Sequence, residues 1–327
     1  MEIPAYGATA AKAPLEPLKI ERRKPGPHDV EIEILYCGIC HSDVHKVNDD
    51  WGGTHFPVVP GHEIVGRVAS RGTSATRFRE GELVGVGCLV DSCRVCPECR
   101  AGREMFCEKG VTFTFDSFDR NTKTWTYGGY STDIVVDERY VLRVPNGLDP
   151  VRAAPLMCAG ITTYSPLHQF GCNASMRADV TVLSTSRDKE KDASRLGAKH
   201  FVATKELGAL EALEGRFSLI MDTVSAPHDL NKQLTLLRSF GTMVLVGLPP
   251  SGAQLDAFTL VHGNRRIAGS NIGGVAETQE MLDYCGKNGI VADVEVIKAD
   301  QINDAYKRME RGDVRYRFVI DAASLRA

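Results

Sequence analysis

Four cysteines that lie close together constrain the fold of this chain more than any other feature. They fall within residues 93–107, in the segment DSCRVCPECRAGREMFC, at positions Cys93, Cys96, Cys99 and Cys107. In a reducing compartment, C-x2-C pairs at this spacing suit a zinc ion held by four thiolates better than a disulfide framework. Four unrelated buried cysteines are the alternative. We expect a structural zinc that holds an otherwise irregular lobe.

The composition excludes several classes of protein. A length of 327 residues predicts about two domains. The 39 basic and 42 acidic residues give a net charge of -3, without the excess of one sign typical of nucleic-acid or anionic-membrane binding. No apolar run approaches the roughly 20 residues that span a bilayer, and residues 1–17 lack the pattern of a signal peptide. We therefore expect a cytoplasmic protein that binds neither nucleic acid nor membrane.

The other six cysteines are scattered, and two of them have neighbours that indicate a second metal site. Cys40 lies in CGICHSDVH and Cys158 in APLMCAGITTY, while His62 lies in PVVPGHEIVGRV. Each is a common structural residue when taken alone. Two cysteines and one histidine from distant segments, however, form the pattern of a catalytic zinc that keeps one coordination position open. We interpret the remaining four as ordinary thiols: Cys37, Cys88, Cys172 and Cys285.

The hydrophobic pattern of the chain changes near Val151. Before this point, apolar and polar residues alternate in segments such as 30–36 (VEIEILY), which predicts a β-rich domain. After it, strand-like segments such as DVTVLS and FSLIMDT alternate with helix-like ones such as RDKEKDASRL. This alternation predicts a parallel sheet with crossover helices.

Taken together and in order, the motifs of the chain resemble those of one enzyme family. The set is GICHSDVH, PVVPGHEIVGRV, the four-cysteine lobe, YGGYSTDIVVDERY, PLMCAGITTYSPL, DTVSA, LVGLP and DVRYRFVID. It resembles the zinc-dependent medium-chain alcohol dehydrogenases over almost the whole chain. Within them it is most similar to the cinnamyl-alcohol-dehydrogenase-like branch, which reduces aldehydes with NADPH. The resemblance implies a small-molecule aldehyde or alcohol as substrate, with two zinc ions and NADP(H) as cofactors.

The resemblance also implies an α/β protein of two domains. A GroES-like β-rich catalytic domain that carries the zinc ions would comprise residues 1–155 and 290–327, since the tail returns to the first domain in this family. A Rossmann-like, doubly wound parallel sheet domain would comprise residues 156–289. Family members are commonly dimers through this second domain, which makes a homodimer the expectation here.

Around the catalytic zinc, the resemblance assigns five residues. Cys40, His62 and Cys158 match the three fixed ligands. Glu63 matches a carboxylate that either approaches the metal or stays beside it without binding. Asp43 matches the residue that hydrogen-bonds the ring of the ligating histidine, which fixes its tautomer and raises its basicity as a ligand.

Two further residues match a proton relay. Ser42 matches the hydroxyl that takes the proton from the substrate, and His45 matches the terminal imidazole. A hydroxyl both donates and accepts, and histidine titrates near neutrality, so these residue types suit the task. A surface histidine is the plainer interpretation of His45. Trp51 resembles a residue that lines an apolar substrate pocket, although packing on the zinc loop is an alternative.

The preference for NADP follows from the residues at the end of the strand DVTVLS. NAD-dependent enzymes place an Asp or Glu there for the ribose 2′-hydroxyl, and a carboxylate would repel a 2′-phosphate. Here the positions are Ser184, Thr185, Ser186, Arg187 and Lys189, and hydroxyls with cations suit a phosphate. A strand-to-helix turn with a serine cap would need no ligand. Further positions match cofactor contacts of the family: Thr162, Thr223, Gly247, Ser270 and Ile272.

One part of the family pattern is missing. The first Rossmann strand, its glycine-rich turn and its helix belong between YSPLHQF and ADVTVLS, where only GCNASMR is present. We interpret this as a deletion of roughly twenty residues near 171–178, which leaves the second domain incomplete and removes the backbone donors that hold the pyrophosphate. Either the second strand moves in to pair with its new neighbour, or this domain is loosely folded.

Two hypotheses of function follow. The first is a zinc-dependent NADP(H) oxidoreductase that interconverts primary alcohols and aldehydes and acts mainly as an aldehyde reductase. The second is a truncated, catalytically impaired homologue that keeps both metal sites but cannot bind the dinucleotide productively. The zinc ligands do not separate them, because both hypotheses retain those ligands.

Overall fold

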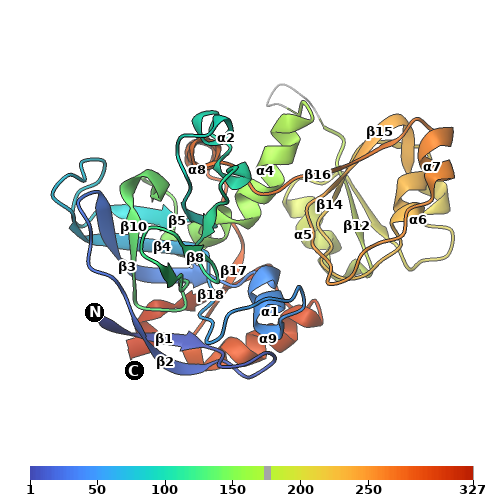
Figure 1. Cartoon of the computed structure of the whole chain (residues 1–327). Helices are drawn as coiled ribbons and strands as arrows, with labels where there is room; N and C mark the ends of the chain where they lie inside the picture. The colour runs from blue at the N-terminus through green and yellow to red at the C-terminus, as the bar shows by residue number, and fades with distance from the viewer. Residues whose placement is uncertain (173–177, 327) are drawn as a thin grey trace. The chain divides into compact units, whose positions relative to one another are not determined.

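The computed structural model describes residues 1–172 and 178–326, which divide by their contacts into two compact units (Figure 1). Unit 1 comprises Met1–Tyr164 and Asn271–Ala327, and unit 2 comprises Ser165–Ser270. The sequence predicts divisions after residues 155 and 289, whereas the contacts place them after 164 and 270. The helix α8 (Val275–Asn288) accounts for one difference, because it belongs to a buried apolar cluster of unit 1 that includes Leu142, Val144, Leu148, Met281, Leu282 and Cys285.

A seven-stranded sheet forms the centre of unit 1. Its order is β11 (Leu142–Arg143), β5 (Leu83–Val86), β4 (Glu63–Arg71), β3 (Asp29–Gly38), β18 (Arg317–Asp321) and β17 (Val294–Ile297), with β10 (Asp133–Asp137) also paired to β3. The pairs are antiparallel except β17 with β18. In β3, Val30, Ile32 and Ile34 are buried, as the alternating pattern of this segment predicts.

Smaller elements complete unit 1. The remaining strands are β1 (Glu2–Gly7), β2 (Glu16–Glu21), β6 (Leu89–Asp91), β7 (Thr112–Phe113), β8 (Phe118–Asp119) and β9 (Thr124–Trp125). Its other helices are α1 (His41–Asn48), α2 (Pro97–Arg100), α3 (Pro150–Ala153), α9 (Ile302–Glu310) and the first part of α4 (Ala159–Gln169). No helix within the described ranges is long and apolar enough to cross a membrane.

Unit 2 has the alternation of strands and helices that its sequence predicts. Its elements in chain order are β12 (Thr181–Ser184), α5 (Glu190–Arg195), β13 (His200–Ala203), β14 (Phe217–Asp222), α6 (Leu230–Thr235), β15 (Leu237–Leu245), α7 (Ala257–His262) and β16 (Arg266–Gly269). All strand pairs in this unit are parallel.

The parallel strands of unit 2 form two separate sheets. One contains β12 and β13, and the other contains β14, β15 and β16. In the described residues no ladder joins β12 to β14, so of the two alternatives the one in which the second strand moves in to pair is wrong. The predicted deletion near 171–178 falls largely on residues 173–177, which lie outside the described residues. Two separate sheets are what the predicted deletion of a central strand would produce.

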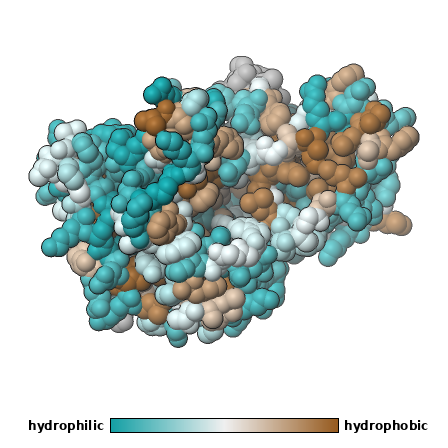
Figure 2. All heavy atoms as spheres, viewed as in Figure 1, coloured by the Kyte–Doolittle hydropathy of each residue, from teal (hydrophilic) through white to brown (hydrophobic). Residues whose placement is uncertain are grey.

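Unit 2 buries its apolar side chains unevenly. Its buried cluster consists of Leu230, Leu234, Leu237 and Met243, all beside the three-stranded sheet. All four residues of β12 are only partly buried. Figure 2 shows apolar side chains gathered on the surface of this unit, and several large ones are exposed: Leu207, Phe240, Leu248, Phe258 and Val261.

Candidate active site and metal centres

Four potential ligands from distant segments meet in unit 1. The ligand atoms of Cys40, His62, Glu63 and Cys158 all lie within 4.8 Å of one another. Cys40 immediately precedes α1, His62 immediately precedes β4, and Cys158 immediately precedes α4. The two thiol sulfurs are 4.0 Å apart although 118 residues separate them in the chain. Two thiols and an imidazole at this spacing are a suitable donor set for zinc.

Two glycines allow Cys158 to reach this cluster. An added Cβ on Gly85 would lie 2.3 Å from Cε of Met157, and one on Gly87 would lie 2.8 Å from the Met157 carbonyl oxygen. Side chains at these positions would therefore push residues 154–158 away from β5. The close approach of the two segments brings Cys158 over the end of β5, where it faces Cys40 and His62.

Asp43 links helix α1 to the imidazole of His62. Its Oδ2 accepts a hydrogen bond from the backbone N–H of Cys40 at 2.8 Å, which caps the start of α1. Its Oδ1 lies 3.1 Å from Nδ1 of His62 and also accepts from the backbone N–H of Gly61 at 3.1 Å. Burial lowers the pKa of His62, but the Asp43 carboxylate outweighs this and raises it well above its ordinary value. With Nδ1 facing Asp43, Nε2 is the nitrogen left for a metal.

Glu63 forms an ion pair that the sequence did not indicate. Its carboxylate accepts from Nε of Arg317 at 3.0 Å and also pairs with Nη2 of the same side chain. Gly38 lies between the two strands that carry these residues, pairing with Glu63 of β4 and with Val319 of β18. A Cβ on Gly38 would lie 2.0 Å from Oε2 of Glu63. The Glu63 carboxylate therefore fits here only because residue 38 is a glycine.

The ion pair concerns the question whether Glu63 binds the metal or stays beside it. Burial raises the pKa of Glu63 to about 7, against the opposing effect of Arg317. The carboxylate is completely buried, so it requires a partner, and Arg317 provides one. In this arrangement Glu63 lies beside the ligand cluster while it is paired with Arg317. Arg317 was missed because a single arginine in the strand RFVID gives no sign of which buried acid it faces.

The relay candidates lie on α1. The Ser42 hydroxyl is 3.4 Å from Nε2 of His62, and therefore at the metal-facing side of that ring. His45 is buried, with Nδ1 at 2.8 Å from Asp50. Its Nε2 is buried and has no hydrogen-bond partner among the described residues. The Trp51 ring lies 4.9 Å from the His45 ring, which agrees with packing on this loop.

Two residues near the cluster were missed by sequence reasoning. The ring of Phe115 lies 5.6 Å from that of His62 in a stacked arrangement and supplies an apolar surface beside the metal ligands. Cys88, interpreted as an ordinary thiol, hydrogen-bonds to Cys158, and this contact lowers its pKa. Its position is decided by the approach of β5 to residues 154–158, which no local motif predicts.

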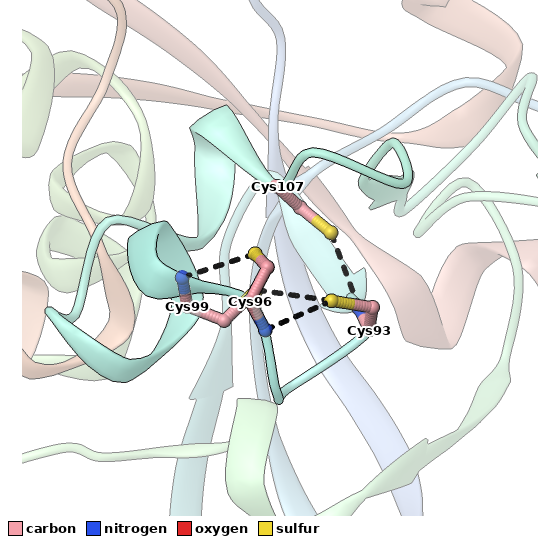
Figure 3. A group of neighbouring side chains, drawn as sticks. All are labelled: Cys93, Cys96, Cys99 and Cys107. Atoms are coloured by element: carbon pink, nitrogen blue, oxygen red, sulfur yellow. Dashed lines mark hydrogen bonds between the residues drawn. The ribbon is translucent and has the colours of Figure 1, made fainter.

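The four lobe cysteines converge as the spacing predicts. Figure 3 shows Cys93, Cys96, Cys99 and Cys107 pointing toward one another, and their sulfurs form a single candidate metal group. Backbone N–H groups donate to three of the sulfurs at 3.3–3.5 Å, which orients them. Burial raises the pKa of Cys99 to about 12. Because four adjacent thiolates repel one another, a cation is required before all four can be charged.

The predicted cofactor residues of unit 2 lie at the ends of its parallel strands. Ser184 ends β12, while Thr223, Gly247 and Ser270 follow β14, β15 and β16. The carboxyl ends of parallel strands are where doubly wound sheets bind ligands. The Ser270 hydroxyl oxygen is buried and has no partner among the described residues. Of the remaining candidates, Thr185, Ser186 and Lys189 follow Ser184, and Thr162 and Ile272 belong to unit 1.

Comparisons with known proteins identify the family. Residues 26–146 match the alcohol dehydrogenase GroES-like domain, and residues 171–287 match the zinc-binding dehydrogenase family. NADP-dependent alcohol dehydrogenase C of Mycobacterium tuberculosis is 48% identical over 344 positions that cover 99% of each chain. The chain belongs to the zinc-binding alcohol dehydrogenases. Aldehyde reductase YahK of Escherichia coli is 49% identical to this dehydrogenase, again over 99% of each chain.

Solved structures agree with this assignment. A cinnamyl alcohol dehydrogenase of Sorghum bicolor is 39% identical to this dehydrogenase, with a TM-score of 0.95, over 99% of this chain and 98% of the other. A cinnamyl alcohol dehydrogenase of Helicobacter pylori, solved with NADP(H), is 36% identical with a TM-score of 0.92 over 99% of both chains. The resemblance inferred from the motifs is thus confirmed, as are the GroES-like and Rossmann-like parts.

The alignments also bear on the missing segment. The alignment with the M. tuberculosis enzyme extends over 344 positions, although this dehydrogenase has only 327 residues. The relative therefore has residues without a counterpart in this chain. The relatives named above are all alcohol dehydrogenases or aldehyde reductases, so the comparisons give no support to the hypothesis of a zinc-binding non-enzyme.

Proposed function

We propose that this dehydrogenase interconverts primary alcohols and aldehydes with NADP(H), mainly in the direction of aldehyde reduction. The observation that carries the proposal is the convergence of Cys40, His62 and Cys158, with Asp43 holding His62 so that Nε2 faces the two thiols. When bound there, zinc supplies a Lewis acid for the substrate oxygen, and the nicotinamide carries the hydride. The second candidate group, in the lobe, suits a structural zinc because all four of its donors are thiols.

The chain's own residues provide a path for the proton. The Ser42 hydroxyl, next to Nε2 of His62, is placed to exchange a proton with the substrate oxygen. His45 has one nitrogen at Asp50, and the other has no hydrogen-bond partner in the described part of the chain, so it is available to pass a proton on. Phe115 stacks on a face of the His62 ring and supplies an apolar surface beside it, which would help to exclude water from the site.

The choice of NADP(H) is supported by the chemistry at the strand ends. Ser184 ends β12 and Thr185 and Ser186 follow it, without an acidic residue at the position that would repel a 2′-phosphate. The Ser270 hydroxyl, which has no hydrogen-bond partner within residues 1–172 and 178–326, is a further polar group available to a ligand. A relative that aligns over 99% of both chains is named as NADP-dependent, and the H. pylori structure contains NADP(H). The missing glycine-rich turn is the feature against which the proposal must be tested.

The test has two steps on the purified, zinc-loaded chain. NADPH is first titrated and followed by the change in nicotinamide fluorescence, and aldehyde reduction is then followed by the loss of NADPH absorbance. We expect saturable binding and turnover, with Cys40→Ser as a control that binds NADPH but does not turn over. A chain that retains two zinc ions yet binds no NADPH at millimolar concentration would contradict the proposal and favour the impaired homologue.

Two expectations about assembly and location stay predictions. A homodimer would appear as a species of twice the chain mass in sedimentation velocity, and a monomer at all concentrations would contradict it. A cytoplasmic location also stays a prediction, and fractionation of cells that express the chain would test it.

A further inference from the structure

The loop that follows β12 is bound to the turn that follows β13. Ser184 pairs with Ala203 at the ends of these parallel strands, and the backbone N–H of Thr204 donates to the Ser184 carbonyl at 2.7 Å. Residues 184–189 and residues 204–206 therefore lie side by side at the same edge of the sheet. This is the edge where the proposed function places the 2′-phosphate of NADP(H).

Carboxylates accept hydrogen bonds from two polar side chains of this loop, Arg187 and Ser186. Nε and Nη2 of Arg187 donate to the two carboxylate oxygens of Glu206 at 2.6 and 2.8 Å. Nη1 of Arg187 donates to Glu190 at 3.0 Å, and the Ser186 hydroxyl donates to Asp188 at 2.8 Å. Arginine also uses this pair of N–H groups, Nε and Nη2, to bind a phosphate through two parallel hydrogen bonds. We call this pair the Arg187 fork.

We infer that Glu206 determines how strongly this dehydrogenase binds nucleotides with a 2′-phosphate, by occupying the Arg187 fork that the phosphate needs. The inference rests on the proposed use of NADP(H). A 2′-phosphate has to displace Glu206 from Arg187, or share the guanidinium with it. In both cases the negative charge of Glu206 opposes the charge of the incoming phosphate.

The charges of the region agree with this role. Bonding to Glu206 raises the pKa of Arg187, and bonding to Arg187 lowers the pKa of Glu206, so both groups are charged near neutrality. The Arg187 side chain is 53% exposed and the Glu206 side chain 50%, so a ligand can reach the pair from solvent. An exposed pair contributes little to stability, so its removal should change binding without unfolding the unit.

The test compares Glu206→Gln with the wild-type chain by calorimetric titration. The probes are 2′,5′-ADP and 5′-AMP, which differ only in the 2′-phosphate and both lack the pyrophosphate that would need the missing turn. We expect Glu206→Gln to bind 2′,5′-ADP about three- to tenfold more tightly, since one opposing charge close to a dianion is removed in a screened, exposed site. The Kd for 5′-AMP should stay unchanged. Glu211→Gln, an exposed glutamate of the same unit, is the matched control and should change neither Kd.

The alternatives have distinct outcomes. If the wild-type chain binds 2′,5′-ADP more tightly than 5′-AMP but Glu206→Gln does not strengthen this binding, the inference about Glu206 is wrong and the proposed cofactor stands. If binding weakens, Glu206 positions Arg187 for the phosphate and the inference is also overturned. If neither protein distinguishes the two probes, the assignment of the 2′-phosphate to this loop fails, and the inference fails with it.

Discussion

Replacing Asp43 by Asn tests the arrangement of the catalytic cluster most directly. Asp43 is completely buried, and its two oxygens accept from Gly61 and His62 on one side and from Cys40 and the Tyr130 hydroxyl on the other. Asn keeps the size of the side chain and one oxygen. If that oxygen stays at His62, the amide N–H₂ faces the backbone N–H of Cys40, and this buried donor loses its partner.

The magnitude follows from these contacts. One buried donor left unsatisfied costs about 1–3 kcal/mol of unfolding free energy. Loss of the charge that supports His62 should weaken zinc binding at this site about 10- to 100-fold, the usual effect of removing such a partner. The lobe zinc should be retained, because no lobe cysteine contacts Asp43. Zinc per chain, measured by plasma mass spectrometry after dialysis against graded chelator, should thus fall from two to one at a chelator concentration that leaves the wild-type chain loaded.

The control is a second buried aspartate of unit 1. Asp29 pairs with Arg23 and accepts from the backbone N–H of Gly26, but has no contact with the ligand cluster. Asp29→Asn should therefore lower the urea midpoint and leave both zinc ions in place. If Asp43→Asn retains both zinc ions at the same chelator concentration as the wild-type chain, the argument that Asp43 supports His62 as a ligand is refuted.

Three further predictions concern other parts of the molecule. Cys99→Ser should remove the lobe zinc and lower the melting temperature while the catalytic zinc stays; loss of both zinc ions, measured by mass spectrometry, would contradict two independent sites. Ser184→Asp should shift the ratio of kcat/KM from NADPH toward NADH, because a carboxylate repels a 2′-phosphate, and an unchanged ratio would show that this loop does not select the cofactor. Arg317→Met should destabilise the chain in urea by about 3–5 kcal/mol because it leaves Glu63 buried without its partner. The variant Arg317→Met with Glu63→Gln should recover part of that loss, and no recovery would mean that the pair does not act as a unit.

The two metal centres were not equally predictable from local sequence. The lobe was readable from spacing alone, because Cys93, Cys96 and Cys99 follow one another at intervals that bring their sulfurs together locally. The ligands Cys40, His62 and Cys158 were proposed from three separate motifs, and the family resemblance then matched them to the fixed ligands. Their meeting depends on long-range packing, including the approach of Met157 to two glycines near the end of β5. No local pattern contains that contact.

The contacts of charged residues were the least predictable. Glu63 and Arg317 are separated by 254 residues and meet only because β4 and β18 both pair with β3 at Gly38. The pairing of Arg187 with Glu206 likewise depends on β12 and β13 being adjacent and parallel. A sequence shows that a charged residue is present. Which residue becomes its partner depends on the order of the strands in the folded sheet.

By itself, the sequence determined the family, the residues able to bind two zinc ions, the change from β-rich to alternating structure, and the absence of the glycine-rich turn. These are properties of local spacing and composition. The tertiary structure decided what surrounds each residue: Asp43 behind His62, Arg317 opposite Glu63, and two sheets in unit 2 where the sequence left one rearranged sheet as an alternative. The reason is that the strands on either side of a missing strand pair only if packing brings them together, and packing is a property of the whole fold.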